Sequence, residues 1–363
     1  MWQYIVRRLL LMIPTFFGIT FVCFLVLRMA NVDPVASQME MGLQGGQVSQ
    51  EAIEHLRRIY HLDKPWYEQY ARLVVRLTRP VCIDYLEEGQ FTSAWRPMSR
   101  LACGNQSRIS LDLGTSWRDG RPIIEIIAEA LPITVLLALL SLFIAYSIAI
   151  PLGIYSAVRQ YSVGDQISTV VVFMLYSLPK FWIGTMLLIF FAGGHYLDWF
   201  PLQGWHSFEG FEEMSLGERI GDVAWHIVLP LVTLSYNAFA ALSRYMRTGM
   251  LEVIRQDYIR TARAKGLSEK TVVFKHALRN SLIPIITMLG LLLPFMVSGS
   301  VVVEFIFGIR GMGGVALEAI RLPDYPLVIT IVAFVSLLTM LGILISDILY
   351  GVVDPRISYG KGS

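Results

Sequence analysis

The chain reads Tyr258-Ile-Arg-Thr-Ala-Arg-Ala-Lys-Gly266-Leu-Ser268 at the centre of a basic segment, 244–280, which separates two long uncharged runs. This segment holds nine Lys and Arg residues against three Asp and Glu residues. Lys and Arg gather in the cytoplasmic loops of proteins that cross a membrane several times. We therefore expect 244–280 to be a cytoplasmic loop, and its length and small residues favour contact with a soluble partner.

Long uncharged runs make up much of the remaining chain. The 363 residues are 55% hydrophobic and only 16% charged, whereas a soluble domain carries about 25% charged residues. A helix needs roughly 20 apolar residues to cross a bilayer core about 30 Å thick. The sequence therefore predicts an all-α membrane protein with six transmembrane helices. The first span lies within 1–30, and the others lie at about 130–158, 166–192, 223–243, 281–303 and 325–346.

Charge in the connecting segments gives an orientation. Arg7 and Arg8 precede the first span, whereas 193–222 holds six acidic residues and one Arg. Because Lys and Arg favour the cytoplasmic side, we expect both termini to be cytoplasmic. The uncharged run after Arg8 is longer than the apolar part of a signal peptide, which favours a retained span.

A large extracytoplasmic loop, 31–129, is expected after the first span. Asp63 can cap a helix there. Residues 79–110 are polar and irregular in pattern, and we interpret them as an insertion. Cys82 and Cys103 fall in this insertion, and an oxidising compartment would allow them to pair as a disulfide. The alternative is two free thiols.

Two helices are expected to meet at a tight corner in the basic segment. Leu251–Lys265 is predicted to form the first helix, and Gly266 suits the left-handed residue that follows a helix. Ser268 can then cap a second helix, Glu269–Asn280. We call residues 255–268 the elbow.

The elbow is expected to contact another protein. Its small residues leave the backbone open to close approach, and its cationic residues supply charge to match an acidic rim. The alternative is a basic loop that lies on anionic lipid. The residues assigned to the contact are Tyr258, Arg260, Thr261, Ala262, Arg263, Ala264, Lys265 and Gly266.

The elbow resembles the EAA loop in the membrane subunits of ABC importers, in its peptide-permease form. The similarity extends into the following Lys275-His276-Ala-Leu-Arg279-Asn280-Ser-Leu-Ile-Pro284. The general pattern of this loop is Glu-Ala-Ala, three residues, then Gly. Here Arg260-Thr261-Ala262 occupy the first three positions, so one alanine and Gly266 remain and the usual Glu is absent.

Motifs along nearly the whole chain, apart from roughly 79–110, resemble the B-type permease of dipeptide and oligopeptide importers. They are Tyr4-Ile-Val-Arg7-Arg8-Leu-Leu-Leu-Met-Ile-Pro14-Thr, Asp33-Pro34, Leu62-Asp63-Lys64-Pro65, Asp112-Leu113-Gly114-Thr-Ser116, Leu131-Pro132-Ile-Thr134, Ser298-Gly299-Ser300 through Glu304, Gly311-Met-Gly313, Asp324-Tyr325-Pro326 and Asp354-Pro355-Arg356. Two further stretches, Phe191-Ala-Gly-Gly194 and Asp198-Trp-Phe-Pro-Leu-Gln-Gly204, are similar to the longer YejB-like subtype.

The resemblance implies a type I ABC importer permease fold, with a permease core over 130–363, in a bacterial inner membrane. This chain would form half of the pore, and a second permease of C type would form the other half. Two ATPase subunits would grip the elbow, and an extracytoplasmic peptide-binding protein would deliver peptide. ATP and Mg²⁺ would bind to the ATPase subunits. The chain has no Gly-x-x-x-x-Gly-Lys-Ser/Thr loop, so we expect no cofactor and no enzymatic activity of its own.

Lys180 is a candidate for the translocation path. It lies near the middle of the predicted third span, directly after Pro179. A charge at that depth usually faces a cavity or a partner, so Lys180 is expected to pair with a peptide carboxylate. The alternatives are an acidic residue of the second permease, or a side chain that reaches the membrane surface.

A Gly-rich segment, 304–324, is expected to lie outside the membrane, as a re-entrant element or as a docking element for the binding protein. The alternative is a compact connector between the last two spans. The docking candidates are Glu304, Arg310, Gly311, Gly313 and Asp324.

Other classes of protein have less support. A secondary transporter or channel without an ATPase is the main alternative, but it would favour inverted repeats and more ionisable groups within the spans than Lys180 alone. A membrane hydrolase lacks its usual motifs, since the sequence contains neither His-Glu-x-x-His nor Gly-x-Ser-x-Gly. No metal site is expected, and a net charge of only +2 gives no support for nucleic-acid binding.

Overall fold

The computed structural model describes residues 2–29, 62–78, 80–84, 96–97, 107–111, 113–194, 196–282 and 298–353, and the single residues 54, 58 and 285. The chain divides into two compact units. The first consists of Met1–Arg8, Glu129–Val315 and Leu337–Ser363, and the second of Leu9–Ala128 and Ala316–Ser336.

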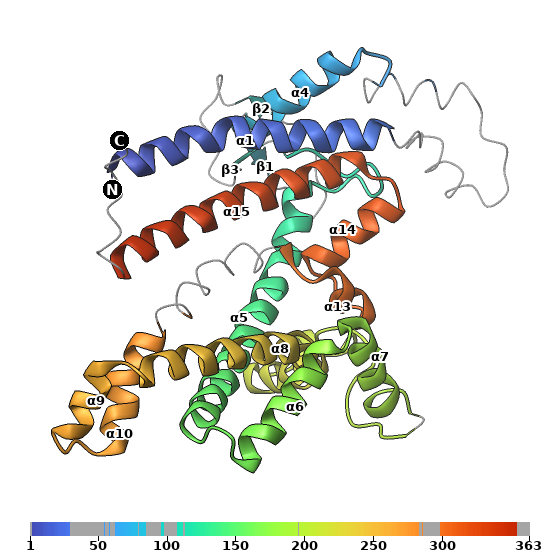
Figure 1. The fold of residues 1–363 in the computed structure, drawn as a ribbon. Helices are drawn as coiled ribbons and strands as arrows, with labels where there is room; N and C mark the ends of the chain where they lie inside the picture. The colour runs from blue at the N-terminus through green and yellow to red at the C-terminus, as the bar shows by residue number, and fades with distance from the viewer. Residues whose placement is uncertain are drawn as a thin grey trace. The chain divides into compact units, whose positions relative to one another are not determined.

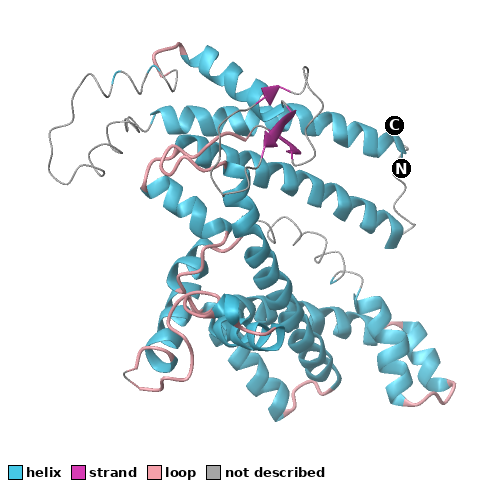
Figure 2. Ribbon diagram, turned by 180° about the vertical axis from the view of Figure 1, so that it is seen from behind, coloured by secondary structure: helices cyan, strands magenta, loops and turns pink. Residues whose placement is uncertain are grey.

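Long helices dominate the described chain (Figures 1 and 2). Four of them are long and apolar enough to cross a membrane: α1 (Trp2–Met29), α5 (Ile123–Val158), α8 (Leu216–Ile254) and α15 (Tyr325–Val353). They confirm the prediction of a helical membrane fold and coincide with four of the six predicted spans. The predicted span over 281–303 falls mainly outside the described residues.

The predicted third span is a bent pair of helices. α6 (Val163–Ser177) and α7 (Lys180–Phe191) meet at 98°, as a broken span or a re-entrant loop would. Leu178 and Pro179 between them are extended, because a proline restricts the residue before it and lacks an N–H. Tyr236 of α8 donates its hydroxyl to the carbonyl oxygen of Leu178 at 2.7 Å. The neighbouring helix thus satisfies a backbone group that the break exposes.

Helix α8 is the centre of the first unit. Both α6 and α7 pack against it, as does the short helix α13 (Val301–Ile306). One buried cluster joins Leu137 of α5, Leu229 of α8 and Val303 of α13. At the two ends of the chain, Arg8 of α1 forms an ion pair with Asp347 of α15 at 2.9 Å.

Helix α4 (Trp66–Thr78) confirms the helix predicted after Asp63, but it begins directly after Pro65, so Asp63 is not its capping residue. It packs on α1 in the second unit. The hydroxyl of Tyr70 donates to the carbonyl oxygen of Phe17 at 2.8 Å. The ring centroids of Tyr70 and Phe21 lie 5.1 Å apart.

The predicted insertion, 79–110, is not wholly irregular, because a small antiparallel sheet lies in it. The strand order is β2-β1-β3. The strands are β1 (Pro80–Asp84), β2 (Arg96–Pro97) and β3 (Ser107–Leu111). Cys82 lies on β1, opposite Arg96 and Ile109. Cys103 lies outside the described residues, so the disulfide stays a prediction.

Helix α14 (Met312–Arg321) precedes α15. Between α7 and α8, a loop contains a short 3₁₀ turn, η1 (Phe211–Glu213). Ser215 begins α8 with a capping box, in which the Ser215 N–H donates to the Glu218 carboxylate at 2.8 Å. Such caps satisfy the N–H groups that a helix start leaves free.

Candidate functional site

The first half of the elbow is helix α9 (Asp257–Ala264). Helix α8 ends at Ile254, and Gln256 is extended (φ −71°, ψ 149°) before α9 begins. The predicted continuous helix over Leu251–Lys265 is therefore wrong. After the break, α9 packs against the segment Val272–Ala277, and the apolar face of α9 is buried.

Gly266 forms the corner of the elbow, as predicted. Its φ of +77° lies in a region that residues with a Cβ rarely adopt. Helix α10 (Glu269–Thr271) begins directly after Ser268, and the π-helix η2 (Val272–Ala277) continues it. The predicted second helix is thus present, with a wide π turn inside it. Such π turns are rare and occur frequently at functional sites.

The elbow rests on a buried apolar cluster. Ile259 and Ala262 lie three positions apart, on one face of α9, and are 0% and 7% exposed. They belong to one cluster with Met246 and Met250 of α8 and with Val272 of η2, all three of which are 0% exposed. Well-packed interiors transmit strain, so a displacement of the elbow is expected to move α8 with it.

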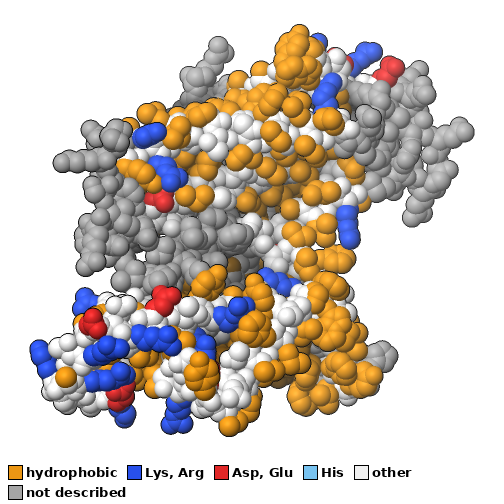
Figure 3. Space-filling model, in the orientation of Figure 1, with side chains coloured by type: hydrophobic (Ala, Val, Ile, Leu, Met, Phe, Trp, Pro, Cys, Tyr) orange, Lys and Arg blue, Asp and Glu red, His pale blue; other side chains and the backbone are white. Residues whose placement is uncertain are grey.

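The outward side of the elbow carries most of the predicted contact residues. Lys and Arg side chains gather over α9 and α10 on the face shown in Figure 3. Ala262 is the exception, because it faces the buried cluster and cannot offer its backbone to a partner. The exposed residues are Tyr258, Arg260, Thr261, Arg263, Ala264, Lys265 and Gly266.

An ion pair closes the elbow on its outward side. Arg263 of α9 donates from Nη2 and Nε to the two carboxylate oxygens of Glu269, at 2.7 and 3.2 Å. These hydrogen bonds lower the pKa of the Glu269 carboxyl and raise the pKa of the Arg263 guanidinium. Both side chains are about half exposed, so the pair orients α9 relative to α10 more than it stabilises them.

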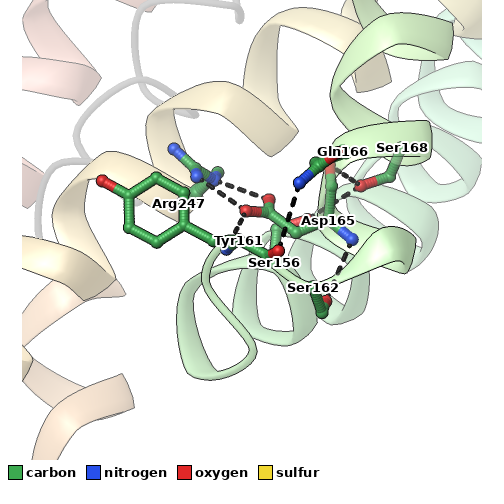
Figure 4. A network of polar contacts seen from close by, with 7 residues as sticks. All are labelled: Ser156, Tyr161, Ser162, Asp165, Gln166, Ser168 and Arg247. Carbon is green, nitrogen blue, oxygen red and sulfur yellow. Dashed lines mark hydrogen bonds and ion pairs between the residues drawn. The ribbon is translucent and has the colours of Figure 1, made fainter.

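A second ion pair connects α8 to the start of α6 (Figure 4). Arg247 donates from Nε and Nη2 to the two carboxylate oxygens of Asp165, at 3.0 and 2.9 Å. Asp165 is 2% exposed and also accepts the backbone N–H of Tyr161 at 2.9 Å. We call Asp165 and Arg247 the clamp. Arg247 lies two helical turns before the end of α8, close to the elbow.

Lys180 lines a cavity of about 370 Å³. It is the first residue of α7, directly after the bend, and not the middle of a continuous helix. The cavity lies between α5, α7, α8 and the segment that begins α13. The other lining residues are Thr134, Leu137, Ala138, Ser141, Leu142, Leu234, Ala238, Gly299, Ser300, Val303 and Glu304.

Glu304 does not face outward as a docking residue would. It is 3% exposed, and its carboxylate accepts the backbone N–H of Gly314 at 2.7 Å and that of Ser300 at 3.2 Å. Thr134 of α5 lies at 3.4 Å from the same carboxylate and accepts the N–H of Met312 at 2.8 Å. Glu304 therefore connects Ser300 and Gly314 from within, and holds together the segment between them, which we call the Gly-rich turn.

Three other docking candidates are also buried. Gly311 and Gly313 pack against Glu304, and a Cβ on Gly311 would lie 2.7 Å from a carboxylate oxygen of Glu304. Asp324 is 1% exposed and accepts the Ser116 hydroxyl at 2.5 Å. The predicted docking role is not supported for these residues, because their side chains or Cα atoms face the interior. Arg310 is exposed.

The sequence does not predict the clamp or the contact between Thr134 and Glu304. Their members lie 82 and 170 positions apart, and nothing local indicates the pairing. An Asp at the edge of an apolar run is a partial signal, since a carboxylate there needs a partner. Within the described residues, no group of three or more His, Cys, Asp or Glu side chains could hold a metal ion.

Comparison with known proteins identifies the family. Residues 149–359 match the family described as the binding-protein-dependent transport system inner membrane component. The chain belongs to this family. Its members are transport subunits of ABC type, so the chain is a multi-pass permease of the inner membrane and forms part of a transport pore.

Relatives of the permease match it from end to end. It is 37% identical to the oligopeptide transport system permease protein AppB of Bacillus subtilis (strain 168), over 98% of this chain and 99% of the relative. It is 33% identical to the peptidoglycan transport system permease protein YejB of Agrobacterium fabrum, over 99% of each chain. It is also 33% identical to the dipeptide transport system permease protein DppB of Escherichia coli (strain K12), over 99% of this chain and 100% of the relative.

Proposed function

We propose that this permease imports dipeptides or oligopeptides, driven by ATP that partner subunits hydrolyse. The names of its relatives support a peptide cargo, since AppB and DppB are permeases for oligopeptides and dipeptides. The elbow supports the energy source, because it presents exposed cationic residues on a rigid base. That combination of an exposed contact side and a buried attachment to α8 is the observation that carries the proposal.

The proposed assembly contains a second permease, two ATPase subunits and an extracytoplasmic peptide-binding protein. ATP and Mg²⁺ would be held by the ATPase subunits and not by this chain. Closure of the ATPase subunits would pull on the elbow, and the buried cluster would pass the movement to α8 as a rigid-body rotation. Arg310, which is exposed, remains a candidate contact for the binding protein.

Both termini are proposed to be cytoplasmic, together with the elbow. The ion pair between Arg8 near the start of α1 and Asp347 near the end of α15 supports one side for both ends. The positive charge of the 244–280 segment supports the cytoplasmic side.

Uptake of a labelled tripeptide into proteoliposomes tests the proposal. This permease would be reconstituted with the partner permease, the ATPase subunits and the binding protein. We expect uptake that requires both ATP and the binding protein. Uptake driven by an ion gradient alone would instead support a secondary transporter and overturn the proposal.

Substitution at Gly266 tests the role of the elbow in the same assay. Gly266→Trp places a large ring where the structure has open space, and is expected to lower uptake about tenfold by blocking a close contact. Gly266→Asn is the matched control, because Asn tolerates a positive φ. Equal uptake by the two variants, with equal amounts in the membrane, would argue against an ATPase contact at this corner.

A further inference from the structure

Lys180 has an unusual electrostatic position. It is the first residue of α7, and a helix N-terminus carries partial positive charge that disfavours a further cation. Among the residues that the structure describes, Lys180 forms no ion pair. An ammonium in such a place, next to an apolar cavity, is available for an anion that the described residues do not supply.

The walls of the cavity show what kind of anion fits. Most of the lining is apolar, with Leu137 and Leu142 from α5, Leu234 from α8 and Val303 from α13. Lys180 itself is exposed, and apolar walls beside it strengthen the attraction between its ammonium and a carboxylate. The cavity therefore suits an anionic group that is joined directly to an apolar one.

Glu304 is the acidic residue of the lining, and it forms no ion pair with Lys180. The carboxylate of Glu304 is already occupied by the N–H groups of Ser300 and Gly314. A peptide amino group would have to displace these buried bonds, which is costly. Of the two ends of a peptide, the cavity accordingly favours the carboxyl end.

We propose that Lys180 binds the carboxyl terminus of the peptide substrate, and that the apolar wall receives its last side chain. This inference rests on the proposed import of peptides and adds a selection step within the permease itself. A volume of about 370 Å³ lies at the small end of ligand sites, which span about 300–1,000 Å³. The cavity therefore takes the end of a peptide and not its whole length.

The test compares Ala-Ala-Leu with its C-terminal amide in the reconstituted assembly. The binding protein is kept saturated with either peptide, so that the rate reports transfer through the permease. We expect the wild type to move the free acid about tenfold to a hundredfold faster than the amide, the range of one charge-assisted hydrogen bond. Lys180→Gln should slow the acid to the rate of the amide, whereas Lys180→Arg should retain the preference.

Lys64→Gln is the control, since it removes a lysine from the segment before α4 and should keep the wild-type ratio. The ratio of acid to amide isolates the contact, because a merely structural loss slows both peptides alike. Equal slowing of both peptides by Lys180→Gln, or no change in either, would overturn the inference. If Lys180→Gln does not assemble, loss of the preference in Lys180→Arg contradicts it equally. Absence of ATP-dependent uptake of both peptides by the wild type would instead contradict the proposed function.

Discussion

The elbow and the Gly-rich turn that follows Ser298 carry similar signals in the sequence but opposite arrangements in the structure. Each combines glycine with charged residues, and each is predicted to contact a partner. The elbow turns its charges outward and buries Ile259 beneath them. In the Gly-rich segment, Glu304 and Asp324 are buried. Glu304 accepts the backbone N–H groups of Ser300 and Gly314, and Asp324 accepts the Ser116 hydroxyl.

The difference shows what decides the role of a charged residue near a glycine. In the Gly-rich turn, closely packed glycines bring N–H groups together without side chains, and a buried carboxylate satisfies them. In the elbow, the backbone groups are already paired within short helices, so Arg260 and Lys265 are free to point outward. A docking surface is therefore expected at the elbow, and an internal scaffold at the turn.

The largest effect is expected from Glu304→Ala. The substitution leaves the N–H groups of Ser300 and Gly314 buried without an acceptor, at a cost of about 3–5 kcal/mol. The thermal midpoint of the purified permease should fall markedly. Glu304→Gln keeps one acceptor oxygen, so its thermal midpoint should lie between that of Glu304→Ala and that of the wild type. An unchanged midpoint for Glu304→Ala would mean that the turn is not held from within.

A smaller loss is expected from Ile259→Ala, at the base of the elbow. Removing this fully buried side chain should cost about 2–4 kcal/mol, including the cavity it leaves. Peptide uptake should fall together with the thermal midpoint, because the elbow loosens from α8. Thr261→Ala on the exposed side is the control, and its free energy of unfolding should stay within about 0.5 kcal/mol of the wild type. Equal stability of the two variants would contradict a buried base.

The clamp should contribute less to the free energy of unfolding than either Glu304 or Ile259. Asp165→Asn removes the charge that both guanidinium nitrogens of Arg247 contact, at a cost of about 1–3 kcal/mol. A double-mutant cycle with Arg247→Met would measure the pairwise term directly. We expect a coupling of about 1 kcal/mol or more, and additive losses would show that the two residues act independently.

The smallest effect is expected at the exposed pair of Arg263 and Glu269. Glu269→Gln should change the free energy of unfolding by less than about 1 kcal/mol, and less still at high salt. Arg263 lowers the pKa of Glu269 in the folded protein. The ion pair therefore contributes fully to stability above the pKa that Glu269 has in the unfolded chain, and this contribution is lost as pH falls through the lower pKa of the folded state. Thermal midpoints of Glu269→Gln and the wild type at low and high salt, and at pH values above and below the pKa of Glu269, would check these effects. A large loss of stability in Glu269→Gln would contradict an orienting role.

The sequence predicts the parts of the fold that depend on local pattern. Uncharged runs mark α1, α5, α8 and α15, and Gly266 marks the corner of the elbow. The three-residue spacing of Ile259 and Ala262 also contains the information that Ala262 is buried, although small size alone suggested exposure. A helical phase was thus a better guide than residue type.

Other features depend on contacts between distant residues. Pro179 predicts a kink, but the 98° bend also depends on the Tyr236 hydroxyl, which donates a hydrogen bond to the carbonyl oxygen of Leu178. The buried place of Glu304 depends on Thr134, and that of Asp165 depends on Arg247. Such pairs form when helices pack, and no local pattern in the chain specifies which helices meet.

The most direct test of the account is thiol labelling of the elbow with and without the ATPase subunits. Ala264→Cys and Ala262→Cys would be made in a variant without the natural cysteines and treated with a maleimide. Ala264→Cys, on the exposed side, should react quickly when the permease is alone and slowly when the ATPase subunits are bound. Ala262→Cys should react slowly in both cases, because position 262 is 7% exposed. Rapid labelling of Ala264→Cys in the presence of bound ATPase subunits would contradict the elbow as their point of contact.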